Sequence, residues 1–255
     1  MNIALITGAS SGLGRVFAQK LSRDPAVDEI WAIARREDRL HQLAESLPCP
    51  VRPIPMDLTQ SESLAQLQTL LKTETPHIEV LICAAGFGTM GPIKQETPDQ
   101  AAKLIDLNCK AAVEVTTLCL PYLHRGSRVL EICSTAAFQP MPGVGLYAAS
   151  KAFLQSYTKT LHYELIPSGI HVTAVCPYWI KDTEFIPVAK AGGKGSFRHF
   201  PLASHAQSVA TLSLLASKLN LWVVTPGIVC TLHRLSAKFI PHFIMVPIID
   251  LIRRL

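Results

Sequence analysis

Short apolar runs alternate with longer stretches of helical period along most of this sequence. The six stretches with helical spacing are residues 14–23, 38–47, 61–73, 98–123, 147–165 and 205–218. The runs rich in β-branched and apolar residues predict strands at residues 3–6, 29–34, 51–55, 80–83, 127–133, 171–176 and 221–224. Strands that alternate with helices are typical of βαβ units, in which the strands are parallel. The pattern therefore predicts an α/β fold with one doubly wound parallel sheet of about seven strands, flanked by helices.

The length and composition fit one domain. A chain of 255 residues can fill the core of a large α/β domain, so we expect residues 1–255 to form a single unit. Hydrophobic residues make up 49% of the chain and charged residues 17%, so either the core is large or a partner or lipid covers apolar surface. A strand-like run begins almost at the N-terminus, which leaves no room for a secretory signal.

Several classes of protein are disfavoured by the charged and metal-ligating residues. The formal net charge of +5 is modest and the basic residues are scattered, so no nucleic-acid partner is expected. The seven cysteines are odd in number and lack CxxC spacing, which predicts reduced thiols in a cytoplasmic protein. The nine histidines form no paired ligand motif, so no metal site is expected.

A glycine-rich turn follows the first predicted strand and opens the first predicted helix. Its sequence is TGASSGLG, residues 7–14. Glycines at such a turn allow the backbone to approach a pyrophosphate, and the helix N-terminus offers free N–H groups and positive partial charge. The alternative is a glycine-rich turn that merely links strand to helix. The context favours a dinucleotide-binding Rossmann fold with these candidate cofactor contacts: Gly8, Ser10, Ser11, Gly12, Leu13 and Gly14.

Two arginines follow the second predicted strand. Dinucleotide-binding folds place here, about 20 residues past the glycines, the residue that reads the adenosine ribose. This chain has Ala34, Arg35 and Arg36 instead of an acidic residue. Guanidinium groups bind a 2′-phosphate through forked, charge-assisted hydrogen bonds, so NADP(H) is favoured over NAD(H). The alternative is two solvated arginines at a helix start, and it applies more to Arg36 than to Arg35.

Three residues near the fifth strand and the helix after it suit carbonyl chemistry. Ser134 ends the strand, and Tyr147 and Lys151 are four residues apart, so both lie on one face of a helix. A neighbouring ammonium would lower the pKa of the phenol and make Tyr147 a general acid or base. Ser134 would hydrogen-bond the substrate oxygen. An exposed Tyr–Lys pair is the alternative, whereas a serine hydrolase is disfavoured because no GxSxG surrounds Ser134.

The order of these motifs resembles the classical short-chain dehydrogenase/reductase family. The matching pieces are TGASSGLG, the Asp57 of MDLT, CAAG at residues 83–86, Asn108 in LNCKA, Ser134 and YAASK at residues 147–151. The resemblance covers nearly the whole chain. It implies that Asp57 and Leu58 bind adenine, that Ala85 and Gly86 border the adenosine and that Lys151 also binds the nicotinamide ribose. It further implies that Asn108 kinks its helix and holds a water that links Lys151 to solvent; an Asn bonded to backbone is the alternative.

The segment after the sixth strand departs from the family pattern. It reads CPYWIKDTEF, with Tyr178 where the family has a glycine after Pro177 and one additional residue before Thr183. Pro177, Ile180 and Thr183 are the candidate nicotinamide contacts.

The candidate substrate contacts are apolar. We expect a substrate loop or lid at residues 184–204, and the candidate contacts are Phe138, Met141, Tyr178 and Phe185. Ordinary lid packing is the alternative for each of them. An apolar pocket suits a steroid or bile-acid-like ketone or a 3-oxoacyl chain.

The C-terminal tail, residues 226–255, is apolar, basic at intervals and interrupted by Pro241 and Pro247. We expect it to cover the substrate mouth, to pack on another subunit or to lie on a membrane surface. It resembles the ketoacyl reductase and hydroxysteroid dehydrogenase branch of the family, which favours lipid metabolism. The family resemblance also implies a homodimer or homotetramer formed through residues 98–123 and 147–165.

The sequence thus predicts an NADP(H)-dependent oxidoreductase that transfers a hydride between nicotinamide and a carbonyl or secondary alcohol. The alternative is a non-catalytic cofactor sensor or scaffold on the same fold. The presence of Asn108, Ser134, Tyr147 and Lys151 together argues against that alternative, because a protein without turnover needs no such set.

Overall fold

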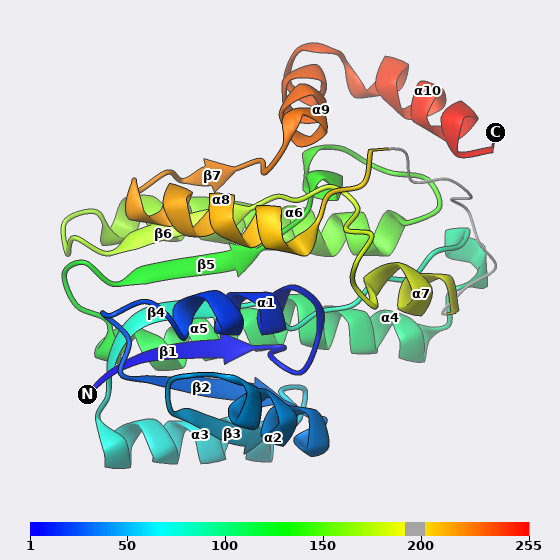
Figure 1. Cartoon of the computed structure of the whole chain (residues 1–255). Helices are drawn as coiled ribbons and strands as arrows, with labels where there is room; N and C mark the ends of the chain where they lie inside the picture. The colour runs from blue at the N-terminus through cyan, green and yellow to red at the C-terminus, as the bar shows by residue number, and fades with distance from the viewer. Residues whose placement is uncertain (192–201, 255) are drawn as a thin grey trace.

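A seven-stranded parallel sheet forms the centre of the molecule (Figure 1). The computed structural model describes residues 1–191 and 202–254. The strand order is β3-β2-β1-β4-β5-β6-β7, and every adjacent pair is parallel. The strands are β1 (Asn2–Thr7), β2 (Glu29–Ala34), β3 (Val51–Pro55), β4 (His77–Cys83), β5 (Arg128–Ile132), β6 (His171–Val175) and β7 (Val223–Val224). The predicted doubly wound α/β fold is confirmed, and the order changes direction between β1 and β4, where such sheets bind their ligands.

Helices cover both faces of this sheet. On one face lie α1 (Gly12–Leu21), α2 (Glu37–Ser46) and α8 (Ala206–Lys218), and on the other lie α3 (Ser61–Glu74), α5 (Ala112–Cys119) and α6 (Gly145–Leu165). Strand residues alternate between the two resulting cores. In β1, Ala4 and Ile6 face the α1 side, whereas Ile3 and Leu5 face the α3 side. Both faces are apolar because both are covered, as expected for a parallel sheet.

The region predicted as one helix over residues 98–123 is divided into four segments. These are α4 (Pro98–Ile105), the π-helical turn η2 (Asp106–Ala111), α5 and the 3₁₀ turn η3 (Leu120–Tyr122). The N-terminus of α4 is a capping box in which Thr97 and Gln100 bond each other's backbone N–H. π-Helical turns occur frequently at functional sites, and this one contains Asn108.

Short helical segments also occur outside the predicted stretches. Two are 3₁₀ turns, η1 (Ile93–Gln95) and η4 (Thr135–Phe138), and α7 (Phe185–Ala191) begins the predicted substrate loop. Residues 192–201 of that loop, which contain all three of its glycines, lie outside the described residues.

The C-terminal tail forms two further helices. They are α9 (Ile228–Phe239) and α10 (His242–Arg254), separated at Pro241. Figure 1 shows them beyond the β7 edge of the sheet, with α10 leading to the C-terminus. Among residues 1–191 and 202–254, no helix combines the length and apolar character that crossing a bilayer requires.

Candidate active site

The glycine turn between β1 and α1 has a backbone that side chains would obstruct. Gly8 and Gly12 have φ values of 69° and 53°, in the left-handed region that favours glycine. A Cβ at Gly8 would lie 2.9 Å from the backbone of Ala84, and one at Gly14 would lie 2.5 Å from the Gly8 oxygen. The turn therefore packs closely against the end of β4, and no side-chain hydrogen bond caps the N-terminus of α1. This cradle fits the pyrophosphate of a nicotinamide dinucleotide.

The two arginines after β2 have different surroundings. The Arg36 guanidinium donates from Nη2 to the Ser11 hydroxyl at 2.5 Å and to the Ser10 hydroxyl at 3.2 Å. The Arg35 side chain is 72% exposed, and its Nη1 lies 3.9 Å from Asp57 Oδ2. Arg36 thus orders the glycine turn, whereas Arg35 presents its guanidinium beside the end of β3. Both positions border the region expected for the adenosine ribose.

A carboxylate from the substrate loop joins this group. Glu184 accepts hydrogen bonds from Arg39 and from Arg36, at 2.5 and 2.9 Å. These bonds lower the pKa of Glu184 to about 2. The sequence analysis did not single out Arg39 or Glu184, because only the fold brings residues so distant in sequence together.

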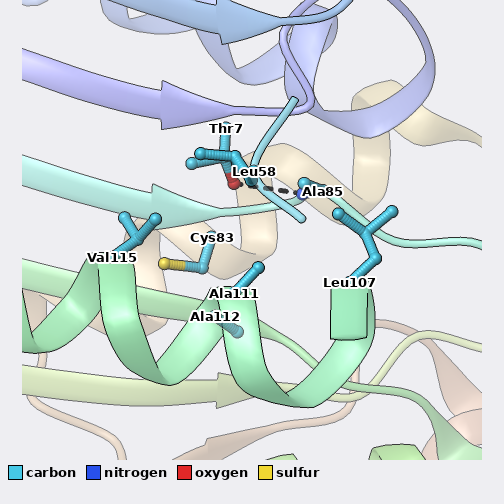
Figure 2. Close-up of a pocket in the computed structure, with 8 residues that line it drawn as sticks. All are labelled: Thr7, Leu58, Cys83, Ala85, Leu107, Ala111, Ala112 and Val115. Carbon is cyan, nitrogen blue, oxygen red and sulfur yellow. Dashed lines mark hydrogen bonds between the residues drawn. The ribbon is translucent and has the colours of Figure 1, made fainter. Parts of the chain in front are cut away.

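The residues expected around adenine lie at the ends of β3 and β4. Figure 2 shows a small pocket lined by Leu58 and Ala85, among others, beside η2 and α5. The Thr7 hydroxyl accepts from the Ala84 and Ala85 N–H groups at 3.1 Å, which ties β1 to the end of β4. Asp57 Oδ1 accepts from the Thr59 backbone and hydroxyl, at 3.0 and 2.8 Å. The structure therefore brings Leu58 and Ala85 together and places Asp57 at the start of the next loop.

Ser134, Tyr147 and Lys151 meet at the carboxyl end of β5. Ser134 caps η4, where its hydroxyl accepts from the Ala136 N–H at 3.1 Å. Tyr147 and Lys151 lie in the first two turns of α6, and all three side chains are buried. The Lys151 ammonium donates to the Ile132 carbonyl at 2.7 Å and lies 5.9 Å from the centroid of the Tyr147 ring.

The electrostatics of this group differ from the sequence expectation that Lys151 lowers the pKa of Tyr147. Burial raises the pKa of the Tyr147 phenol well above its ordinary value, and the neighbouring Ser134 hydroxyl opposes this only in part. Burial also lowers the pKa of the Lys151 ammonium. Both shifts arise because a low-dielectric site disfavours the charged form of each group. Tyr147 therefore keeps its proton at neutral pH.

Asn108 lies in the π-helical turn and is fully buried. Its Oδ1 accepts from the Phe87 N–H at 3.1 Å, and its Nδ2 donates to the Phe87 carbonyl at 2.9 Å and to the Ser150 hydroxyl at 3.2 Å. A Cβ at Gly86 would lie 3.0 Å from Asn108 Oδ1 and 3.5 Å from Lys151 Nζ. Asn108, Gly86 and Lys151 are thus neighbours, and the side chain of Asn108 holds the chain after β4. The water expected from the family resemblance stays a prediction.

The segment after β6 contacts both the catalytic group and the glycine turn. The Pro177 carbonyl accepts from the Thr135 N–H at 3.0 Å. The Thr183 hydroxyl donates to the Ile180 carbonyl at 3.1 Å, and a Cβ at Gly12 would lie 3.7 Å from Thr183 Cβ. Pro177 therefore lies beside η4, and Thr183 lies against the glycine turn. This is the placement expected of residues that border a bound dinucleotide.

Apolar side chains gather around the Tyr147 ring. The Phe185 ring centroid lies 5.5 Å from that of Tyr147 and 6.3 Å from that of Trp179. Met141 belongs to the same buried group. We call this group the Tyr147 cluster; besides Tyr147, it includes Phe87, Met90, Met141, Trp179, Phe185 and Ile249. Of the predicted substrate contacts, Phe185 therefore lies next to Tyr147, and Met141 belongs to the same cluster.

The other two predicted substrate contacts lie against α9. The Phe138 ring is 6.0 Å from the His233 ring, edge to face. The Tyr178 N–H donates to Cys230 Sγ at 3.2 Å. Phe138 and Tyr178 stay predictions as substrate contacts, and the contacts that the structure gives them are with the tail.

Three residues near the site escaped the sequence analysis. A Cβ at Gly88 would lie 2.9 Å from the Phe185 ring and 3.2 Å from the Tyr147 ring, so only glycine fits there without displacing one of them. Trp179 and Ile249 belong to the Tyr147 cluster. Gly88 lies in a loop that no motif marks. Ile249 lies in the C-terminal tail, whose position no local pattern specifies. Trp179 directly follows the predicted substrate contact Tyr178, and its large aromatic side chain was the one feature of the sequence that could have identified it.

Gln139 is also notable. It is buried, between η4 and Met141, and neither its Oε1 nor its Nε2 has a hydrogen-bond partner within the described residues. Burial of an amide without hydrogen bonds is costly. A water or a polar ligand group would satisfy these two atoms.

Comparisons with known proteins agree with this geometry. Residues 2–191 match the family described as short chain dehydrogenase. Human 17-beta-hydroxysteroid dehydrogenase type 1 is 31% identical over 182 residues, which cover 68% of this chain and 55% of that protein. The chain thus matches about half the length of that enzyme.

Two solved structures are similar over most of their length. A short-chain dehydrogenase from Sphingobium yanoikuyae in complex with NADPH has a TM-score of 0.79 and 27% identity, and the match covers 93% of each chain. A bulky-bulky ketone specific alcohol dehydrogenase from Comamonas testosteroni has a TM-score of 0.74 and 28% identity, covering 89% of this chain and 87% of that one. Both structural matches cover a larger share of the chain than residues 2–191.

Proposed function

The chain belongs to the short-chain dehydrogenase family, and from this premise we propose that it is an NADPH-dependent reductase of apolar ketones. The observation that carries the proposal is the buried group of Ser134, Tyr147 and Lys151 beside an apolar cluster and an open glycine turn. Each part has a role in carbonyl reduction. The family supplies the reaction class, and the residues of this chain suggest its direction, its cofactor and its substrate class.

The proton and the substrate oxygen are handled by Ser134 and Tyr147. NADPH, when bound, supplies the hydride to the carbonyl carbon. As negative charge develops on the substrate oxygen, Tyr147 donates its phenolic proton to that oxygen and Ser134 donates a hydrogen bond to it. Lys151 is positioned by the Ile132 carbonyl to hold the nicotinamide ribose and to stabilise the phenolate that remains. The apolar cluster keeps water from the reacting carbonyl.

The protonation state of Tyr147 favours the reductive direction. Burial raises its pKa, so the phenol is protonated at neutral pH and ready to donate. Alcohol oxidation needs the phenolate instead, which is scarce at that pH. A secondary alcohol is therefore the proposed product.

The proposed cofactor preference for NADP(H) rests on the arginines after β2. Arg35 is exposed at the expected ribose position, and Arg36 and Arg39 lie behind it. A 2′-phosphate would gain charge-assisted hydrogen bonds there that NAD(H) lacks. A similar structure is a complex with NADPH, which supports the same choice.

The proposed substrate is a bulky apolar ketone such as a steroid or bile-acid-like ketone, with a 3-oxoacyl chain as the second candidate. Met141, Phe185 and Trp179 offer an apolar wall beside Tyr147. Two similar proteins are named for a hydroxysteroid and for bulky ketones. We propose a role in cytoplasmic lipid metabolism, which the free state of all seven cysteines supports.

A substrate panel with one variant tests the proposal. Purified protein is mixed with NADPH and with steroids, bile acids, 3-oxoacyl esters or simple ketones, and loss of NADPH absorbance is recorded. We expect turnover with at least one bulky apolar ketone. We expect Tyr147→Phe to bind NADPH as wild type does but to lose turnover by roughly a thousandfold or more, because it has no acidic proton. Unchanged turnover in Tyr147→Phe would refute the mechanism.

The competing candidate, a cofactor sensor or scaffold without turnover, makes a different prediction. It would bind NADPH with no ketone reduction across the whole panel, and Tyr147→Phe would change nothing. The buried and hydrogen-bonded Ser134, Tyr147 and Lys151 argue against it, because burying polar groups without use costs stability.

A further inference from the structure

Helix α9 turns its apolar stripe away from the body of the protein. Ile228, Leu232, Leu235 and Phe239 follow one another at spacings of four, three and four residues, so they form one stripe along the helix. All four are exposed, and Phe239 is 73% exposed. A surface helix normally buries such a stripe against the core. In α9 the apolar stripe instead faces away from the core.

The opposite face of α9 explains this orientation. Cys230 is buried and accepts a hydrogen bond from the Tyr178 N–H at 3.2 Å. The His233 ring packs edge to face on Phe138, and the Arg234 guanidinium lies 5.9 Å from the centroid of the Trp222 ring. The more polar face is thus held on η4 and β7. Specific contacts, and not loose packing, present the apolar stripe to the outside.

Helix α10 continues the apolar surface. Phe243 is 79% exposed, and Ile244, Ile248 and Leu251 are also exposed at helical spacing. On its other side, Met245 is buried and Ile249 packs into the Tyr147 cluster. Helices α9 and α10 thus both expose apolar side chains, and Ile249 of α10 packs against the Tyr147 cluster. We call the exposed side chains of Ile228, Leu232, Leu235, Phe239, Phe243 and Ile248 the tail surface.

The charge of the tail matches an anionic surface. Residues 226–255 contain four basic residues, Arg234, Lys238, Arg253 and Arg254, and one acidic residue, Asp250. The tail therefore carries +3 of the formal +5 of the whole chain in 30 of its 255 residues. Lys238 is exposed next to Phe239, so a basic group and an aromatic ring lie together on the surface. Apolar side chains flanked by basic ones are typical of helices that lie in the headgroup region of a bilayer.

We propose that α9 and α10 dock the protein on the surface of a membrane that contains anionic lipid. The tail surface enters the boundary between headgroups and acyl chains, and the exposed Lys238 next to Phe239 contacts the lipid phosphates. At 12 and 13 residues, the helices are about 18–20 Å long, which suits an orientation along the surface. A second copy of this +5 chain would bury the apolar stripe but would leave the basic residues opposed to like charge.

Docking would place the Tyr147 cluster next to the bilayer, because Ile249 of α10 belongs to that cluster. Apolar ketones partition into bilayers, so this arrangement would deliver the substrate class proposed above. That consequence rests on the proposed function, whereas the docking itself does not. Binding to vesicles is therefore measured without ketone or cofactor, so the two proposals can fail separately.

The test is co-sedimentation of the full chain with phosphatidylcholine vesicles, with and without phosphatidylglycerol. The test variant is Leu232→Gln, Phe239→Gln and Phe243→Gln combined, which removes three exposed apolar side chains. The matched control is Leu212→Gln, Leu215→Gln and Leu219→Gln on and next to α8, where the three leucines are also exposed. NADPH binding by each variant confirms that it is folded, and sedimentation velocity records its oligomeric state.

We expect wild type and the α8 control to bind the phosphatidylglycerol vesicles, less so as salt is raised, and to bind pure phosphatidylcholine weakly. The tail variant should lose binding on the order of tenfold or more, because three apolar side chains no longer enter the bilayer. The proposal is overturned if wild type does not sediment with the anionic vesicles or if the tail variant binds as wild type does. It is also overturned if the tail variant only dissociates an oligomer, since the tail surface would then be an interface between copies.

Discussion

At the scale of single residues, the protonation of Tyr147 is the property that most affects the chemistry. Its phenol is buried beside an ammonium, and burial raises the pKa of the phenol and lowers that of the ammonium. The sequence spacing identified Tyr147 and Lys151 as a pair but suggested that the pKa of Tyr147 would be lowered. A site of this kind is prepared to give a proton away, and it takes one up only when the surroundings favour the phenolate.

The pH dependence of the two reaction directions follows from this shift. Because the pKa of Tyr147 is raised above its ordinary value of about 10, the phenol is fully protonated between pH 7 and 9. Ketone reduction should therefore be nearly constant over this range. Alcohol oxidation should rise by up to about tenfold per pH unit, in proportion to the phenolate. Initial rates in both directions, at saturating cofactor, check this; a reduction rate that falls steeply from pH 7 to 9 would contradict it.

Arg35 and Arg36 are expected to affect cofactor binding differently. Arg35 is exposed and free to meet a 2′-phosphate, so Arg35→Ala should weaken NADPH binding by roughly 10- to 100-fold and change NADH binding little. Arg36 bonds Ser10 and Ser11 of the glycine turn, so Arg36→Ala should weaken both cofactors. Fluorescence titration measures the dissociation constants of NADPH and NADH for each variant and for wild type, which gives the four ratios of variant to wild type. Equal losses of NADPH and NADH in Arg35→Ala would remove the basis for the 2′-phosphate assignment.

At the scale of elements, the packing of β5 on α5 includes a buried carboxyl group. Glu131 in β5 is fully buried, and its Oε1 accepts from the Thr116 hydroxyl of α5 at 2.6 Å, while its Oε2 has no hydrogen-bond partner within the described residues. Burial raises the pKa of Glu131 to about 7. Two neighbouring elements are thus joined through a group that is best accommodated when neutral.

This carboxyl group makes stability depend on pH. The unfolded chain loses the Glu131 proton near pH 4.5 and the folded chain near pH 7, so folding takes up a proton between these values. The free energy of unfolding should therefore fall as pH rises from about 4.5 to 7, by roughly 3 kcal/mol at most. Glu131→Gln, which cannot ionise, should remove this dependence and raise Tm at pH 8. Denaturant unfolding of both proteins at pH 5 and pH 8 tests this, and identical pH slopes would show that Glu131 is not responsible.

Helix boundaries also show the limit of local patterns at this scale. The capping box at Thr97 could be recognised in the sequence, and the family resemblance implied a kink at Asn108, but no local pattern specified the π-helical turn at Asp106–Ala111. Its cause is the side chain of Asn108, which bonds the Phe87 backbone and Ser150 instead of remaining in its own helix. These partners lie 21 and 42 residues away, so no local propensity predicts the distortion.

At the scale of the whole molecule, the predicted homodimer or homotetramer remains a proposal. Apolar side chains are exposed on the helices expected to form its interface. Phe153 and Tyr163 of α6 and Ile105 of α4 are all exposed in the single chain, Phe153 to 51%. Such a surface is typical of one that another subunit covers.

Replacement of Phe153 by a charged residue tests this interface. Phe153→Glu would place a carboxylate in an apolar contact, so the protein should shift to monomer by at least about tenfold in dissociation constant. Sedimentation velocity measures the distribution. Leu232→Glu on α9 is the matched control and should leave the oligomer intact. A wild-type protein that is monomeric at all concentrations would exclude the predicted assembly.

The sequence by itself determined the fold class, the order of elements and the candidate catalytic and cofactor residues. Most of these depend on local chemistry: hydrophobic period, glycines at the first turn, and residue types at set distances from strand ends. The roles of Asp57, Ala85, Gly86 and Asn108 came from the resemblance to the family. It could also show that the tail is apolar and basic.

Only the tertiary structure decided which side of each element meets another. It gave Arg35 and Arg36 different surroundings and brought Glu184 into contact with Arg36 and Arg39. It also brought Phe138 and Tyr178 into contact with residues of α9 and exposed the apolar stripe of that helix. It also set the pKa of Tyr147, since burial there depends on everything packed around the ring. The physical reason is common to all of these. Burial and contact are produced by residues far apart in the chain, whereas a sequence pattern records only what neighbouring residues can do.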